Sequence, residues 1–96
     1  MVEFKDKIMG SILDNIYNKA KMIRTPNATK LNFNQEWQRK LVREAISEVA
    51  NTKDEKGNTL VPAKDQKMVT DAVMRLLVNY DNADLSNPAE REIIAQ

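Results

Sequence analysis

The sequence predicts a small all-α protein, a bundle of three or four helices in a single domain over residues 1–96. Apolar residues recur every three or four positions along most of the chain, which is the helical period. No stretch shows the sustained apolar and polar alternation that predicts a strand. With 42% apolar residues, two glycines and three prolines, the composition is that of a globular domain and not of a disordered segment.

The first helix is expected near residues 2–24. Its apolar residues fall at four-residue intervals from Phe4 through Ile8 to Ala20, and their neighbours widen the stripe into a broad buried face. Pro26 should end this helix, because a residue that precedes proline is driven out of the helical backbone region.

The second helix is expected near residues 34–51, with Asn32 or Asn34 as its cap. Gln35 follows Asn32 at the spacing of a capping box. The stripe that follows consists of Trp37, Leu41, Val42, Ala45, Ile46 and Val49. Because Trp37 is in register with this stripe, we expect it to be buried.

A charged loop around Gly57 should follow, because Gly57-Asn58 is the strongest turn signal in the chain. We expect Leu60 and Val61 to dock on the core from this loop. The third helix is expected near residues 63–80, where the pairs Met68/Val69, Ala72/Val73 and Leu76/Leu77 give the cleanest helical period in the sequence.

The fourth helix is expected near residues 88–96. Asn87 is a good cap, Pro88 suits the first helical position, and Glu90 has capping-box spacing from Asn87. Only about two turns remain after this start, and so short a helix must dock on the others to be stable.

The composition excludes most catalytic chemistry. Without cysteine the chain has no disulfide, thiolate nucleophile or zinc thiolate site, and without histidine it lacks the commonest general base near neutral pH. Asp81 and Glu92 have the spacing of a calcium loop, but Ala83, Leu85 and Ser86 occupy positions that the loop needs for ligands or glycine. There is no glycine-rich phosphate loop either. We therefore expect no enzyme activity, no cofactor and no metal.

The first residues lack the basic and apolar regions of a secretory signal, and no apolar run approaches the length of a membrane span. The sequence thus favours a cytoplasmic protein with no membrane partner.

Basic residues are segregated in the first half of a chain whose net charge is only +1. Between residues 19 and 43 the only acid is Glu36, whereas the basic residues are Lys19, Lys21, Arg24, Lys30, Arg39, Lys40 and Arg43. Three of them lie opposite the apolar stripe of the second helix. If the first two helices pack antiparallel, all seven lie near one end of the bundle and can track nucleic-acid phosphates.

Each of these features has an alternative interpretation. The basic segment is also consistent with a solvated face, which is what charge runs usually form, and in it Glu36 pairs with its basic neighbours on the helix. Trp37 and Phe33 flank the basic residues and are candidate stacking platforms for unpaired bases, the alternative to burial. Met74 and Val78 fall slightly off the third helix's main stripe, where they either bind a partner or pack against the last helix.

The middle and end of the chain resemble the YqeY family, which is similar to the tail domain of the GatB subunit of tRNA-dependent amidotransferases. The residues that match its first pattern are Arg43, Val49, Asn51, Lys56, Gly57 and Leu60, and those that match its second are Asp84-Leu85 and Glu92-Ile93. The sequence departs from the family at Pro62, where an acidic helix start is usual, and contains no counterpart of the family's C-terminal three-helix domain. The resemblance implies a non-catalytic helical module that works near tRNA.

Two amphipathic segments, Ile12–Asn18 and Leu76–Tyr80, resemble parts of class IIa bacteriocin immunity proteins, which are antiparallel four-helix bundles that recognise a protein complex. We therefore carry two functional hypotheses. The first is a non-enzymatic, tRNA-associated module that binds RNA through its seven basic residues. The alternative is a protein-interaction module, such as an immunity protein or a phage-type inhibitor.

Overall fold

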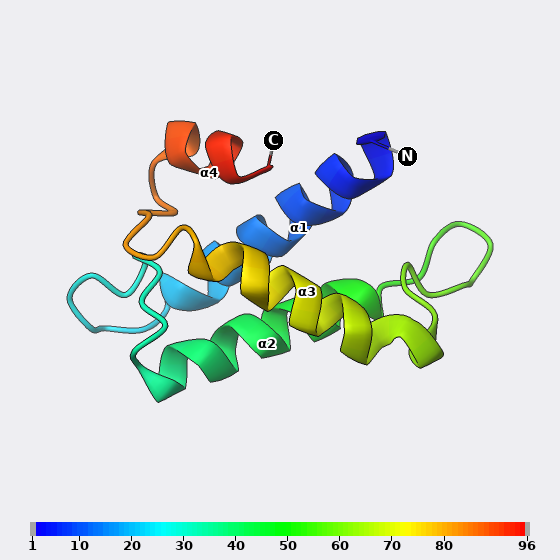
Figure 1. Ribbon diagram of the computed structural model, residues 1–96, viewed down its shortest axis with the longest axis horizontal. Coiled ribbons are helices and arrows are strands. Elements are labelled where there is room, and N and C mark those ends of the chain that lie inside the picture. Colours follow the sequence, from blue (N-terminus) through cyan, green and yellow to red (C-terminus); the bar gives the residue numbers. More distant parts are fainter. Residues whose placement is uncertain (1, 96) are drawn as a thin grey trace.

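A computed structural model describes the backbone of residues 2–95 and the side chains of residues 8–95. Its helices are α1 (Val2–Ala20), α2 (Glu36–Ala50), α3 (Gln66–Val78) and α4 (Pro88–Ala95), and one turn of 3-10 helix, Ala63–Asp65, leads into α3 (Figure 1). Within residues 2–95 there is no strand, only two isolated β-bridges. The predicted small all-α fold is therefore confirmed. The side chain of Phe4, expected to begin the buried stripe, lies outside the described part.

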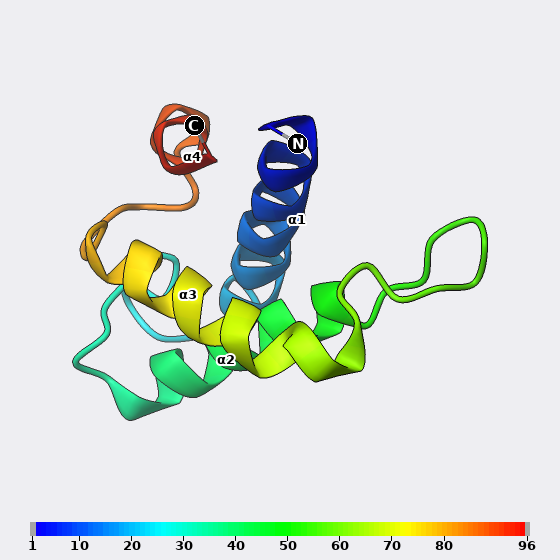
Figure 2. The same cartoon turned by 45° about the vertical axis from the view of Figure 1, so that its right-hand side comes forward.

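The first two helices cross (Figure 2). Asn15 donates a hydrogen bond of 3.1 Å to the carbonyl of Ala45, and one turn later Lys19 forms an ion pair of 2.5 Å with Glu48. The two helices run in opposite directions (Figure 1). Ile23, just beyond the end of α1, lines a hollow with Trp37 at the start of α2. At the other end, Ile8 of α1 lies near Val61, whose amide donates to the carbonyl of Ala50 at the end of α2. The packing is therefore antiparallel. Helix α1 also packs against α4, whereas α3 packs against α2.

The core draws apolar side chains from all four helices and from two of the links between them. Its buried members are Met9, Ile12, Leu13, Ile16, Leu31, Leu41, Val42, Ala45, Ile46, Val49, Met74, Leu77, Leu85 and Ile94. Val61 is buried and Leu60 is partly buried against this core, as predicted. Helix α3 contributes only Met74 and Leu77 as fully buried residues, and much of its apolar stripe is half-exposed.

Helix α1 ends at Ala20, before the position expected from Pro26. The chain tightens there, because the amides of Met22 and Ile23 donate to the carbonyls of Lys19 and Ala20 at 3.3 and 3.0 Å, a spacing of three residues. This turn brings Ile23 back against the core.

Helix α2 starts at Glu36, and Gln35 in the N-cap position makes no side-chain cap. The capping box predicted for Asn32 and Gln35 is therefore wrong. Asn32 instead accepts a hydrogen bond of 3.1 Å from the amide of Asn34, which forms a local turn.

At α4 the predicted cap is confirmed, because Asn87 Oδ1 accepts a hydrogen bond of 3.0 Å from the amide of Ala89. Glu90 departs from the capping-box prediction. Its carboxylate accepts from the amide of Asp84 at 3.1 Å and so holds the link before the helix.

The link between α1 and α2 is fastened to the link between α3 and α4, and we call this pairing the link clasp. Leu31 donates to the carbonyl of Ala83 at 2.9 Å, and the amide of Asn82 donates back to Leu31 at 2.6 Å. The amide of Leu85 donates to the carbonyl of Thr29 at 3.0 Å. Since Leu31 and Leu85 are both buried, the clasp closes one end of the core.

Gln38 supports the link clasp from α2. It is 3% exposed and is the one buried polar side chain among the described residues. Its amide nitrogen donates to the carbonyls of Ala28 and Lys30 at 3.2 and 2.5 Å, and its oxygen accepts from the amide of Asn32. Both hydrogens of its amide nitrogen and one of the two lone pairs of its oxygen are thus used.

Candidate functional site

The structure brings four of the seven basic residues together at the first half of α2. Lys19 and Lys40 line one shallow hollow there, and Lys40 lines another with Arg39 and Arg43. Lys19 points toward α2, where it pairs with Glu48. Lys21, two residues later, lies over the ring of Tyr17 at 5.4 Å, and Arg91 of α4 lies at the same distance from that ring. Because two residues turn a helix by about 200°, neighbouring cations of this segment face opposite sides of the molecule.

Two more of the seven lie in the link between α1 and α2. Lys30 lies in the link clasp, where its backbone forms a β-bridge with Asp84. Hydrogen bonds from Ser86 are the main cause that lowers the pKa of Asp84, and Thr29 and the charge of Lys30 add to it, against the opposing effect of desolvation. Arg24 is exposed in the turn that follows α1.

The basic residues of α2 share their surface with acids. Arg39, Lys40 and Arg43 line a shallow hollow together with Glu36 and Glu44. Arg39 also donates from Nη1 to the carbonyl of Phe33 at 2.5 Å, which holds its guanidinium against the start of the helix. The outer surface of α2 is therefore mixed in charge.

Trp37 is 37% exposed, so the prediction that it is buried is wrong. It lines a second shallow hollow beside Lys19 and Lys40. The buried face of α2 is centred near Gln38, Ala45 and Val49, and one residue of rotation carries Trp37 about 100° away from Gln38, to the edge of that face.

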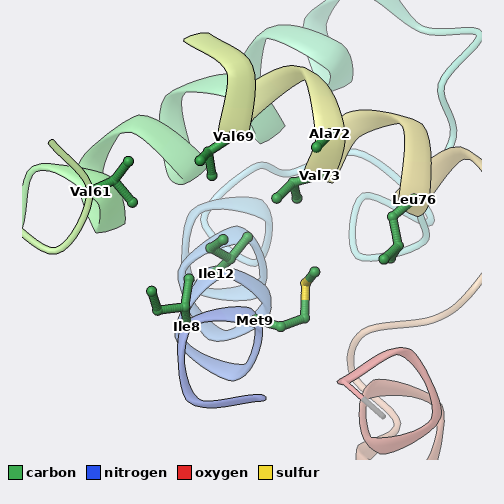
Figure 3. A pocket seen from close by; sticks show the side chains of 8 residues that line it. All are labelled: Ile8, Met9, Ile12, Val61, Val69, Ala72, Val73 and Leu76. Atoms are coloured by element: carbon green, nitrogen blue, oxygen red, sulfur yellow. The ribbon is translucent and has the colours of Figure 1, made fainter. Parts of the chain in front are cut away.

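An apolar groove runs between α1 and α3, and we call it the α1/α3 groove (Figure 3). It has a volume of about 260 Å³ and is lined by Ile8, Met9, Ile12, Val61, Val69, Ala72, Val73 and Leu76. Figure 3 shows the α3 side chains pointing across the gap toward those of α1. All eight lining residues are apolar, whereas the hollows beside Trp37 and beside Arg39 include charged side chains.

Sequence reasoning did not locate this groove, although its signal was present. The third helix carries apolar residues in adjacent pairs, which make its apolar face too broad for one neighbouring helix to cover. In the structure Met74 and Leu77 are the buried residues of α3, whereas Val69, Ala72, Val73 and Leu76 line the groove.

The two residues expected to bind a partner have different positions. Met74 is only 9% exposed and belongs to the core. Its side chain is therefore not available to a partner. Val78 is 51% exposed at the last position of α3 and does not line the groove.

Among the described residues, no group of three or more Asp or Glu side chains is placed to hold a metal ion. No helix within residues 2–95 has both the length and the apolar character to cross a bilayer. Comparison with protein-family models, curated proteins and solved structures gave no match to this chain. The resemblances to the YqeY family and to the bacteriocin immunity proteins stay predictions.

Proposed function

We propose that this protein is a protein-interaction module that binds its partner in the α1/α3 groove. The supporting observation is that eight apolar side chains from three segments line a groove that is open to solvent. Contiguous exposed apolar surface on a small protein is typical of a binding site, because leaving it in water forgoes about 25 cal/mol for each Å². Met68, which is 66% exposed, extends the apolar character of α3 toward the solvent.

Selection from a displayed peptide library, followed by affinity measurements on two variants, tests this proposal. Ala72 lines the groove and is itself exposed, so Ala72→Phe fills the groove without disturbing the core. Ala89 is also an exposed helical alanine, but it lies on α4, so Ala89→Phe is the matched control. Selected peptides should lose at least about tenfold in affinity with Ala72→Phe, which corresponds to about 1.4 kcal/mol, and nothing with Ala89→Phe. Peptides that bind both variants equally would refute the groove as the binding site.

RNA binding is a second candidate, favoured by the exposure of Trp37 beside Lys19 and Lys40. An exposed aromatic ring next to lysines is an arrangement that stacks unpaired bases and contacts phosphates. Two observations reduce its weight: Glu48 already pairs with Lys19, and Glu44 lines the same hollow.

Trp37 is the only tryptophan in the chain, so its fluorescence reports directly on a bound single-stranded RNA. A single strand releases about 0.7 counterion for each phosphate contacted. Contacts by Lys19 and Lys40 alone give a slope of log K against log salt of about −1.4, whereas seven contacts give about −5. A slope near −1.4 with strong quenching supports the local site, and unchanged fluorescence in low salt would exclude it.

A further inference from the structure

The α1/α3 groove continues into a row of apolar side chains on the outside of α3. Met68, Ala72 and Leu76 are four residues apart, so they form one ridge along the helix, which we call the α3 row. Ala72 and Leu76 also line the groove, while Ala72 is exposed and Met68 is 66% exposed. The α3 row and the groove are therefore one continuous apolar surface that is open to solvent.

The α3 row is symmetric about Ala72. Met68 and Leu76 lie four residues to either side of it, about 6 Å away along the helix. If two α3 helices cross antiparallel at Ala72, Met68 of each copy meets Leu76 of the other. Ridges of residues four apart pack into one another at the commonest crossing angle, about −50°, and the small Ala72 side chains at the crossing let the helices approach closely. The row is thus self-complementary, as the interface of a two-fold dimer must be.

The charges on one flank of the α3 row are complementary in the same arrangement. Stepping 100° for each residue places Arg75 about 60° and Asp71 about 100° from Ala72, both on the side of α3 away from the groove. A two-fold axis brings this flank of one α3 beside the same flank of the other, with Arg75 about 3 Å along the axis from Asp71 of the second copy. Arg75 is exposed and forms no ion pair within residues 8–95. Two symmetric pairs of opposite charge therefore favour a second copy of this chain as the occupant.

The size of the surface sets the strength of this pairing. A standard interface buries about 800 Å² on each partner, which is more than about two turns of one helix and the adjoining groove supply. The net charge of the chain is only +1, so two copies repel each other little. A second copy is thus expected to bind weakly and reversibly.

From these observations we infer that a second copy of this chain covers the α1/α3 groove, in a weak symmetric dimer whose two α3 helices pack antiparallel about Ala72. This inference rests on the proposed function, since it names the partner of the same groove.

Sedimentation equilibrium and methyl NMR of the full chain, from about 10 μM to about 1 mM, test this inference. The average mass should rise toward that of a dimer, and the methyl signals of Ile8, Val69 and Val73 in the groove should shift over the same range. A chain that stays monomeric at the highest concentration would overturn the inference. A dimer whose groove signals do not shift would overturn it as well.

Variants of α3 test the geometry of the dimer. Ala72→Glu places two carboxylates against each other at the crossing and should raise the dissociation constant at least about tenfold. Arg75→Glu faces Asp71 of the other copy and should raise it about three- to tenfold, whereas adding Asp71→Lys exchanges the two charges and should restore the affinity. Lys67→Glu is the matched control, because it makes the same change of charge at an exposed site on α3 about 140° from Ala72, and it should have no effect. An unaltered dissociation constant in Ala72→Glu, or equal effects of Arg75→Glu and Lys67→Glu, would overturn the inference.

The outcomes separate this inference from the proposed function. If the chain stays monomeric while library-selected peptides bind and lose affinity with Ala72→Phe, the occupant is a different protein, so the inference fails and the proposed function stands. If neither a second copy nor any selected peptide shifts the groove signals, the proposed function itself fails.

Discussion

Replacing Gln38 with leucine should release the link clasp from α2. Leucine has nearly the same volume and suits a buried site, but it removes the partner of three backbone groups, the carbonyls of Ala28 and Lys30 and the amide of Asn32. A buried group left unsatisfied costs about 1–3 kcal/mol, and a group near the surface costs less because water replaces the partner. Ala28 is buried, Asn32 is partly covered and Lys30 is exposed, so we expect a loss of about 2–4 kcal/mol in the free energy of unfolding.

Urea denaturation followed by Trp37 fluorescence and by circular dichroism measures this loss. For a slope of about 1–3 kcal/mol per molar urea, the expected loss lowers the midpoint by about 1 M or more. Gln35→Leu is the control, because Gln35 is exposed and its side chain makes no capping hydrogen bond. That variant should stay within about 0.5 kcal/mol of the unaltered protein. If the two variants are equally stable, the side chain of Gln38 does not hold the clasp and the reasoning is refuted.

Three further predictions concern the turns and the charges. Gly57 has a φ of +84°, which disfavours any residue with a Cβ, so Gly57→Ala should lower the melting temperature by about 4–8 °C. Gly10 lies within α1, so Gly10→Ala should raise the melting temperature. The opposite pair of effects would contradict the left-handed turn at Gly57. Because the pKa of Asp84 is lowered in the folded protein, its carboxylate stabilises the fold at pH values above its ordinary pKa of 3.8, and this stabilisation is lost as the pH falls through the folded pKa. Asp84→Asn should therefore reduce the loss of stability in acid, measured as the free energy of unfolding at several pH values. Lys19 and Glu48 are 30% and 53% exposed, so a double-mutant cycle should give a coupling energy of about 0.2–1 kcal/mol that decreases in 1 M salt. A coupling energy that is the same at low and high salt would contradict a solvent-screened ion pair.

Local signals in the sequence account for the helices and for some of their ends. The pairs along residues 68–77 and the Asn87-Pro88 start required only neighbouring residues, and both correspond to helices in the structure. The apolar pair Leu60-Val61 also docks on the core as expected. These features could be predicted because each depends on interactions within a few residues along the chain.

Features that depend on distant residues could not be predicted in the same way. The link clasp joins Leu31 to Ala83 and Thr29 to Leu85, contacts between links that have no pattern of their own. Gln38 is in register with the buried face of α2, but the backbone groups that its side chain bonds come from the first link and become neighbours only when that link folds over it. The acids that lie among the basic residues could not be predicted for the same reason, since the packing of α1 on α2 decides which side chains face one another.

The link clasp and the α1/α3 groove are two consequences of one arrangement. The clasp ties together the links that follow α1 and α3, so the C-terminal ends of those helices are held near each other. Helix α1 then crosses α2 and rises toward α4, while α3 stays on α2, so α1 and α3 diverge away from the clasp (Figure 2). No further helix of the described chain covers the apolar residues that face each other across this divergence, and they form the groove. Gln38→Leu, which loosens the clasp, should therefore change the methyl NMR signals of the groove residues and also lower the free energy of unfolding. Leu60→Ala, on the loop beyond α2, should lower the free energy of unfolding but leave the link clasp closed.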